Sequence, residues 1–189
     1  MTPTATRFAA TAEATLADVD KLLGIIAALL RIRELEDHAR RSRFAPVNLV
    51  RLVEDACDLH RPTAEDRDIT LSYATEPVPP VDGDASLLIE AVSNLIDNAM
   101  KFGPVGGAVR VTLGIQGRDI VLSVADDGIG VPPAERVLVL QRFYRGRADQ
   151  PGVGLGLPLV KAISDLHGFG LAFATPGSAV SIICVGAVK

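Results

Sequence analysis

The chain contains no tryptophan, and aromatic residues make up only 4% of its 189 residues. Because 48% of the residues are hydrophobic, the interior must be packed mainly with aliphatic side chains. Cysteine is almost as scarce, and the two residues, Cys57 and Cys184, fit no spacing typical of a zinc site. These shortages argue against a disulfide-stabilised secreted scaffold, and we expect two free, buried thiols.

Long hydrophobic runs are also missing. The richest stretch, residues 22–32, is interrupted by Arg31 and is too short to span a bilayer. The N-terminus lacks the layout of a signal peptide. We therefore expect a soluble, cytoplasmic chain without membrane contact, while a membrane-anchored parent protein stays open. The net charge of −4 argues against a surface for nucleic acid.

A helical arm is predicted ahead of the main domain. Apolar residues recur at steps of three and four within residues 15–43, which is typical of a helix buried in a bundle or coiled coil. Pro46 marks a break, Asn48 is suited to cap a second helix through about residue 60, and Pro62 is expected to end it. We divide the chain into a helical arm, residues 1–62, and a main domain, residues 63–189.

The main domain alternates between strand and helix patterns. One helix is expected to begin at Asp84 or Ser86 and to end at Phe102. Further predicted helices cover residues 132–140 and 155–166, and predicted strands cover residues 69–73, 109–115, 120–125, 171–174 and 180–185. The expected fold is therefore α/β, a two-layer sandwich in which helices cover one face of a mixed or antiparallel sheet.

The helix that ends at Phe102 carries a row of polar residues. Asn94 and Asn98 are one turn apart and share a face, with Lys101 about one turn beyond and Glu90 one turn before. Amide oxygens suit a hard cation such as Mg²⁺, and a lysine suits phosphate. From this helix alone, a solvent-facing or capping role for the two asparagines stays open.

An acidic, glycine-containing segment follows the predicted strand at residues 120–125. Asp126 stands at the strand end, and Gly128 and Gly130 come directly after it. A carboxylate beside a backbone that a ligand can approach closely is suited to accept a hydrogen bond from an adenine amino group. A plain Asp-Gly turn between strand and helix explains the isolated segment equally well.

A third segment is rich in glycine and leads into a helix. Gly152, Gly154 and Gly156 alternate with Val153 and Leu155, and their bare N–H groups are suited to phosphate oxygens. The segment is not a dinucleotide-binding fingerprint, because no strand immediately precedes it.

In this order, the segments resemble the ATP-binding domain of sensor histidine kinases, which belongs to the superfamily shared with gyrase, heat-shock chaperone and mismatch-repair ATPases (the GHKL superfamily). "EAVSNLIDNAMKFG" looks like the N box, "DDGIGVPP" like the G1 box, "RFYRG" like the F box and "GVGLGLPLV" like the G2 box. The resemblance covers residue 69 to the C-terminus. It implies the Bergerat-type ATP-binding fold. Residues 1–62 resemble part of the dimerisation and phosphotransfer hairpin.

The resemblance implies a set of ligand contacts. Asn98 would ligate Mg²⁺, Asn94 and Lys101 would contact phosphates or the waters of the metal, and Asp126 would bind the adenine amino group. The other implied ATP-binding positions shape the pocket, bracket the lid or reach the phosphates, and they are Gly128, Gly130, Tyr144, Arg145, Gly152, Gly154, Leu155 and Gly156.

Asn94 bears on the expected reaction. The ATPase branches of the superfamily place a glutamate there to activate water, and an asparagine cannot act as that base. The resemblance therefore favours phosphoryl transfer, with Asn94 and Lys101 in catalytic roles and Glu90 as a candidate general base. An ordinary surface role for Glu90 stays open.

One part of the family pattern is absent. No histidine in the chain stands in a phosphoacceptor segment, and we expect surface or structural roles for His38, His60 and His167. Alone, the chain would not autophosphorylate. The implied partners are a response regulator receiver domain and a second copy joined through the helical arm. Two alternatives stay open: a non-catalytic docking module for a response regulator, and a serine kinase or ATPase of the same superfamily.

Overall fold

The computed structural model describes residue 26 and residues 44–145, 153–174 and 178–188. The long helix predicted within residues 15–43 lies outside this part of the chain, apart from the single residue 26. No helix among the described residues has both the length and the apolar character needed to cross a membrane.

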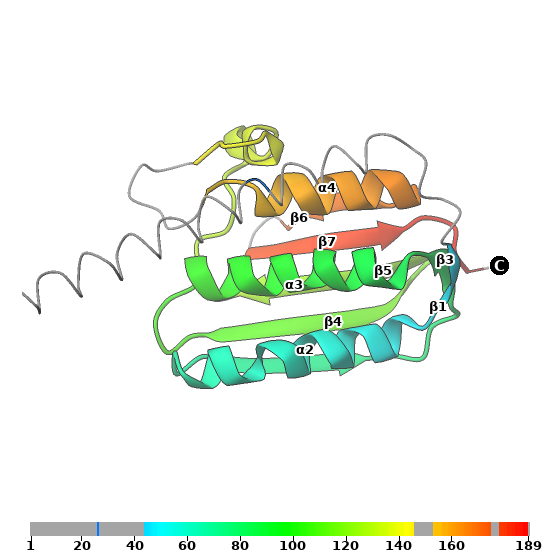
Figure 1. Cartoon of the computed structure of the whole chain (residues 1–189), viewed down its shortest axis with the longest axis horizontal. Helices are drawn as coiled ribbons and strands as arrows, with labels where there is room; N and C mark the ends of the chain where they lie inside the picture. Colours follow the sequence, from blue (N-terminus) through cyan, green and yellow to red (C-terminus); the bar gives the residue numbers. More distant parts are fainter. Residues whose placement is uncertain (1–25, 27–43, 146–152, 175–177, 189) are drawn as a thin grey trace, which may run out of the picture.

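A mixed five-stranded sheet forms one layer, with strand order β2-β4-β5-β7-β6 (Figure 1). Strand β2 (Thr70–Thr75) runs parallel to β4 (Ala108–Gln116). The other neighbours are antiparallel: β5 (Asp119–Asp126), β7 (Ser178–Cys184) and β6 (Gly170–Phe173). A separate two-stranded sheet joins β1 (Ala45–Val47) to β3 (Val81–Gly83). The two small strands were not expected, because runs of three residues carry no readable period.

Alternation along the central hairpin determines which face of the sheet is buried. Val111 of β4 pairs with Val124 of β5, and Leu113 pairs with Leu122. All four side chains are buried, whereas their neighbours along each strand are at least partly exposed. This period of two is the pattern of a sheet with one covered face.

Three helices cover that face: α2 (Leu49–Glu65), α3 (Ala85–Phe102) and α4 (Gly156–His167) (Figure 1). Residues 87, 96, 160 and 163 of α3 and α4 are among the most deeply buried in the chain. Together, the sheet and helices confirm the expected two-layer α/β sandwich.

Side-chain caps begin the first two of these helices. The Asn48 Oδ1 accepts a 3.1 Å hydrogen bond from the Arg51 N–H, as the sequence predicted. The Asp84 Oδ1 accepts from the N–H groups of Ser86 and Leu87 at 3.0 and 3.2 Å. The second cap sets the start of α3 and therefore the positions of its asparagines and Lys101, about three to five turns later.

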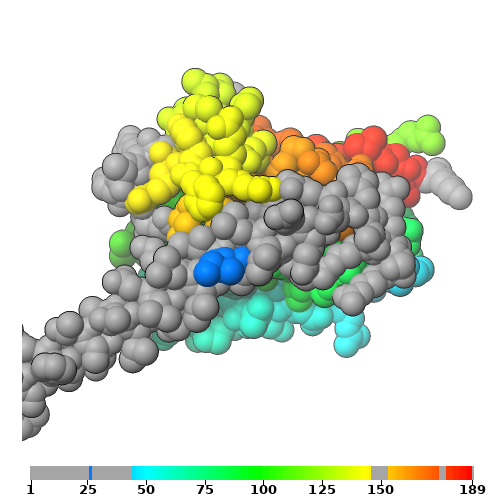
Figure 2. All heavy atoms as spheres, turned by 45° about the horizontal axis from the view of Figure 1, so that its top comes forward, coloured from blue at the N-terminus to red at the C-terminus, as the bar shows by residue number. Residues whose placement is uncertain are grey.

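One predicted helix end and one predicted helix were wrong. Helix α2 does not end at Pro62 but continues to Glu65, because the Pro62 carbonyl still accepts from the Asp66 N–H and Ala64 is buried in the core. Proline removes only one hydrogen bond there. Residues 132–140 do not form one helix but two 3₁₀ turns, η2 (Pro133–Glu135) and η3 (Leu138–Leu140). Figure 2 shows this region, coloured yellow-green to yellow, projecting from the body of the molecule.

The predicted division after residue 62 falls inside helix α2. The apolar face of α2, which includes Val53 and Ala56, belongs to the same hydrophobic cluster as α3, α4 and the sheet. The division itself stays a prediction, but the described part of the arm packs with the main domain.

Candidate nucleotide-binding site

A cavity of about 900 Å³ lies at the C-terminal end of α3. Its walls come from α3, the segment after β5, the start of α4 and the ends of β6 and β7. It brings together most of the predicted site residues, namely Asn94, Asn98, Lys101, Asp126, Gly128, Gly130, Tyr144, Arg145, Gly154, Leu155 and Gly156. Gly152 lies outside the described residues. Glu90 is half-buried one turn before Asn94 and is not among the lining residues.

The asparagines of α3 face the first residue of α4. The Asn94 Nδ2 donates a 2.9 Å hydrogen bond to the Glu90 carbonyl, which orients the Asn94 amide along its own helix. A Cβ at Gly156 would lie 3.1 Å from the Asn98 Nδ2 and 3.3 Å from the Asn94 Oδ1. The missing side chain at position 156 therefore lets α4 begin directly against both amides.

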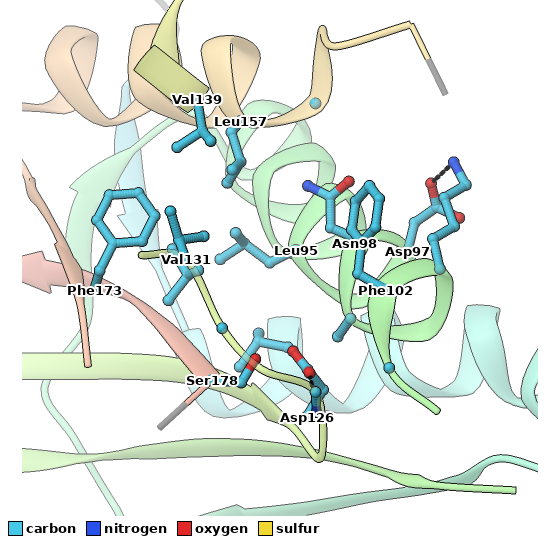
Figure 3. A pocket seen from close by; sticks show the side chains of 18 of the residues that line it. Leu95, Asp97, Asn98, Phe102, Asp126, Val131, Val139, Leu157, Phe173 and Ser178 are labelled. Carbon is cyan, nitrogen blue, oxygen red and sulfur yellow. Dashed lines mark hydrogen bonds and ion pairs between the residues drawn. The ribbon is translucent and has the colours of Figure 1, made fainter. Parts of the chain in front are cut away.

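Lys101 forms an ion pair with Asp97, one turn earlier on α3 (Figure 3). Both side chains are about one third exposed, and both residues line the cavity. A partly exposed pair of this kind contributes little to stability, so a competing anion can displace Asp97 from Lys101 at small cost.

Asp126 combines a turn with a position in the cavity wall. Its Oδ1 accepts a 2.7 Å hydrogen bond from the Gly128 N–H. A Cβ at position 128 would lie only 2.5 Å from this oxygen and 3.1 Å from the Phe102 carbonyl oxygen. The next carboxylate, Asp127, accepts a 2.8 Å hydrogen bond from the Ala108 N–H at the start of β4. These contacts close a turn at Asp126 and tie the segment to the start of β4, and the segment passes close to the end of α3.

The rim of the cavity depends on Gly154. Its carbonyl accepts a 2.9 Å hydrogen bond from the Phe143 N–H, which joins the F box to the G2 box. Gly154 has a φ of +74°, and a Cβ there would lie 2.5 Å from the Tyr144 carbonyl oxygen. Only glycine combines this conformation with so close an approach. The predicted lid, residues 147–151, lies outside the described residues.

An apolar wall completes the cavity, and sequence reasoning missed it. Figure 3 shows Leu95, Val131, Val139, Leu157 and Phe173 around one side of the cavity, away from the Lys101–Asp97 pair. These residues come from separate elements and look like ordinary core positions, so no local signal in the sequence distinguishes them. A cavity with a polar end and an apolar end suits a ligand that carries phosphates and a flat base.

The histidines described by the structure lie outside the cavity lining. The His167 Nδ1–H donates to the Ile163 carbonyl at 2.7 Å, and its Nε2 accepts from the Asp84 N–H at 3.0 Å. Its ring stacks on Phe44 with centroids 4.6 Å apart. Burial lowers the pKa of both His60 and His167. The expected structural role of His167 is confirmed, whereas His38 lies outside the described residues.

Neither cysteine is available for chemistry. Cys57 and Cys184 are free and buried, as the sequence predicted. Burial raises the pKa of Cys57 to about 11 and that of Cys184 to about 12, so both stay protonated near neutral pH. Among the described residues, no group of three or more His, Cys, Asp or Glu side chains could hold a metal ion.

Comparison with known families gives one match that covers more than half of the chain. The family described as histidine kinase-, DNA gyrase B-, and HSP90-like ATPase matches residues 83–185. This range contains every residue of the cavity lining.

Individual relatives agree with this match. The sensor protein kinase PmrB of Pseudomonas aeruginosa is 37% identical over 151 residues, which are 79% of this chain and 31% of that protein. The solved mycobacterial sensor histidine kinase MprB is 36% identical with a TM-score of 0.63, covering 77% of this chain and 99% of the solved chain. Full-length ShkA, solved in complex with AMPPNP, is 27% identical with a TM-score of 0.78, covering 95% of this chain and 39% of that chain.

The curated relatives are much longer than this chain. The chain spans 31% of the length of PmrB and 39% of the length of the sensor-like histidine kinase SenX3 of Mycobacterium bovis. The comparisons therefore concern one part of such proteins.

Proposed function

Because the chain belongs to the family of histidine kinase-, DNA gyrase B- and HSP90-like ATPases, we propose that it is the ATP-binding catalytic part of a two-component sensor histidine kinase. In this role it transfers the γ-phosphoryl group of ATP to a histidine that this chain lacks, for relay to a response regulator. The observation that carries the proposal is that the lining of one cavity includes eleven of the predicted site positions, drawn from the N, G1, F and G2 boxes.

The apolar end of the cavity is suited to the adenine base. Val131, Leu157 and Phe173 provide apolar contact area, and Asp126 stands beside them with one oxygen already bonded to the Gly128 N–H. A carboxylate held in this way can accept from an exocyclic amino group, which adenine has and an oxo-substituted base lacks at that position. The solved complex of ShkA with AMPPNP supports an adenine nucleotide as the ligand.

The polar end is suited to the phosphates. Asn94, Asn98 and Lys101 line it from α3, and α4 begins opposite them at Gly156 without a side-chain cap on its first turn. The unpaired N–H groups at such a helix start attract anions. Lys101 can exchange its partly exposed partner Asp97 for a phosphate.

The residues present fit Mg²⁺ as a companion of the nucleotide. The Asn98 amide offers a neutral oxygen beside the space that a side chain at position 156 would fill. Asn98 is the residue we propose to hold the metal, which would neutralise charge on the phosphates during transfer. Since no cluster of acidic or thiol ligands is available among the described residues, metal binding should depend on the nucleotide.

The protein's own contribution to the chemistry is positioning and charge stabilisation. Asn94 has no carboxylate with which to activate water, so hydrolysis is disfavoured relative to transfer. Lys101 stabilises the negative charge on the phosphoryl oxygens. Glu90 is our candidate to accept the proton of the acceptor histidine, one turn before Asn94. Dimerisation through the helical arm and docking of a receiver domain belong to the same proposal.

The first experiment is a calorimetric titration of Mg-ATP into the wild-type chain, the Asp126→Asn variant and the Asp119→Asn variant. Asp119 also accepts from a backbone N–H, that of Gly186 at 2.7 Å, but it is not in the cavity lining. We expect saturable binding by the wild type and by Asp119→Asn, and binding at least about tenfold weaker for Asp126→Asn, because its amide cannot accept as a carboxylate does. Absence of wild-type binding would refute the proposed function.

A second experiment tests the transfer step. The chain is mixed with γ-³²P-labelled ATP and a separate dimerisation hairpin that carries an acceptor histidine. We expect acid-labile, base-stable label on the hairpin and little release of free phosphate. Steady phosphate release that Asn94→Ala abolishes would instead indicate an ATPase.

A further inference from the structure

Arg136 makes contacts that join two distant segments. It lies between η2 and η3 and is half-buried. Its Nη2 donates a 2.6 Å hydrogen bond to the carbonyl of Ala174, at the end of β6. Its Nε donates a 3.3 Å hydrogen bond to the Val131 carbonyl. The guanidinium carbon also stands 5.8 Å from the centroid of the Phe173 ring.

The three contacted residues share a location. Val131, Phe173 and Ala174 all line the cavity, whereas Arg136 does not. In Figure 3, Val131 and Phe173 lie on the same apolar side of the cavity. The arginine therefore supports this side from behind and fixes the separation of two strand-end segments that no local sequence pattern connects.

The supported segment is only shallowly buried. Neither 3₁₀ turn contains a buried residue, and Val137 is 73% exposed. Figure 2 shows the region projecting from the body of the molecule. A segment with so little buried area is held by specific polar contacts rather than by burial. The guanidinium hydrogen bonds to Val131 and Ala174 are both charge-assisted, and the one to Ala174 is the shorter, the type that contributes most.

We propose that Arg136 is a positioning residue for the adenine end of the nucleotide site. It holds Val131 against Phe173 and Ala174 so that the base enters a preformed apolar slot. This inference rests on the proposed function, since it assigns the base rather than the phosphates to this wall. It follows that Arg136 contributes to affinity for the nucleoside part of the ligand and not to affinity for its phosphates.

The test compares four proteins: wild type, Arg136→Ala, Arg136→Lys and Arg110→Ala. Arg110 is exposed on β4 and is absent from the cavity lining, so it serves as the control for loss of a positive charge. Dissociation constants for Mg-ATP and for adenosine are measured by calorimetry at a temperature where thermal melts show every protein fully folded.

We expect Arg136→Ala to weaken Mg-ATP and adenosine by the same factor, about tenfold. Arg136→Lys keeps a cation that can reach one of the two carbonyls, so its affinities should fall between those of the wild type and the alanine variant. Arg110→Ala should bind both ligands as the wild type does.

Three results would overturn the inference: unchanged affinities in Arg136→Ala, a loss confined to Mg-ATP, or a loss that Arg110→Ala shares. A loss confined to Mg-ATP would indicate an effect of charge on the phosphates, and a loss shared with Arg110→Ala would indicate a general effect of removing a positive charge. If the wild type binds neither ligand, the proposed function fails together with this inference. A binding wild type beside an unaffected Arg136→Ala would refute the inference alone.

Discussion

Single residues create the candidate site partly by what they lack. A Cβ at position 128, 154 or 156 would lie closer to neighbouring atoms than an ordinary van der Waals contact. The shortest distances would be 2.5 Å at Gly128 and Gly154 and 3.1 Å at Gly156. At Gly154 the backbone conformation adds a second requirement, since its φ is +74°. The glycines therefore serve close approach between segments, and their substitution should affect the ligand more than the core.

Gly128→Ala tests this at the G1 box. The new Cβ would lie 2.5 Å from the Asp126 Oδ1 and 3.1 Å from the Phe102 carbonyl oxygen. Asp126 must then move, and overpacking of this kind costs about 1–3 kcal/mol. We expect Mg-ATP affinity to fall by about tenfold or more in a calorimetric titration.

Gly170→Ala is the matched control for that substitution. Its Cβ would lie 3.6 Å from the Ile183 Cβ, an ordinary contact, at a position outside the cavity lining. We expect unchanged affinity for Mg-ATP. Equal affinities in the Gly128 and Gly170 variants would show that the conformation of Asp126 does not matter for binding.

At the scale of elements, α3 is the component that determines the site. Asp84 caps its start, and its last two turns carry Asn98, Asp97 and Lys101 into the cavity. His167, the last residue of α4, reaches the Asp84 N–H and stacks on Phe44. This single ring therefore connects α4, the start of α3 and the segment that enters β1.

The connection predicts a pH dependence of stability. Burial lowers the pKa of His167 below its ordinary value of 6.5, against the opposing effects of the Ile163 hydrogen bond and of Asp84 and Asp82. The unfolded state then binds the proton more readily than the folded state. The contribution of neutral His167 to stability should be complete above pH 6.5. The free energy of unfolding should fall as the pH drops below 6.5 toward the lowered pKa, by at most about 1.4 kcal/mol per pH unit for one histidine.

Urea unfolding from pH 7.5 to 5.0 measures this slope in the wild type, His167→Gln and His60→Gln. Burial also lowers the pKa of His60, against the effect of Asp97, so His60 contributes to the slope in the same direction. We expect each variant to show a shallower decline than the wild type. A slope in His167→Gln equal to that of the wild type would show that His167 does not titrate differently in the folded state.

At the scale of the whole molecule, the described part of the chain has one continuous hydrophobic core. It extends from Val47, through the buried face of α2, to Cys184 at the end of β7. Small two-layer domains with one core usually unfold as a unit. We therefore expect α2 to unfold together with the sheet, although the predicted domain division at residue 62 falls within it.

The two cysteines provide the measurement. Cys57 on α2 is fully buried and Cys184 on β7 is 2% exposed, and burial keeps both thiols protonated. In single-cysteine variants, made by Cys57→Ala or Cys184→Ala, a thiol reagent in low urea should label both sites at similar rates, set by global opening. Labelling of Cys57 that is many times faster would instead mark α2 as a separately unfolding unit.

Much of the fold could be predicted because local rules decide it. The start of α3, expected at Asp84 or Ser86 and capped by Asp84, follows from local capping. The hairpin of β4 and β5 and the glycine-rich start of α4 follow from alternation and turn residues that lie close together in the chain. The boundary at Pro62 was wrong because a buried alanine two residues later outweighed the local preference of proline. The short β1–β3 pair was missed because its pairing joins residues far apart in the chain.

For the site, the sequence by itself determined the polar groups: Asn94, Asn98, Lys101, Asp126 and the glycines stand in motifs that are legible without coordinates. Only the tertiary structure decided the apolar wall, the support from Arg136, the contacts of His167 and the position of Glu90 outside the cavity lining. The physical reason is that motif residues are recognised by their neighbours in the chain. A wall made by Val131 and Phe173 exists only after the sheet and helices have packed, when ordinary apolar residues from separate segments of the chain meet.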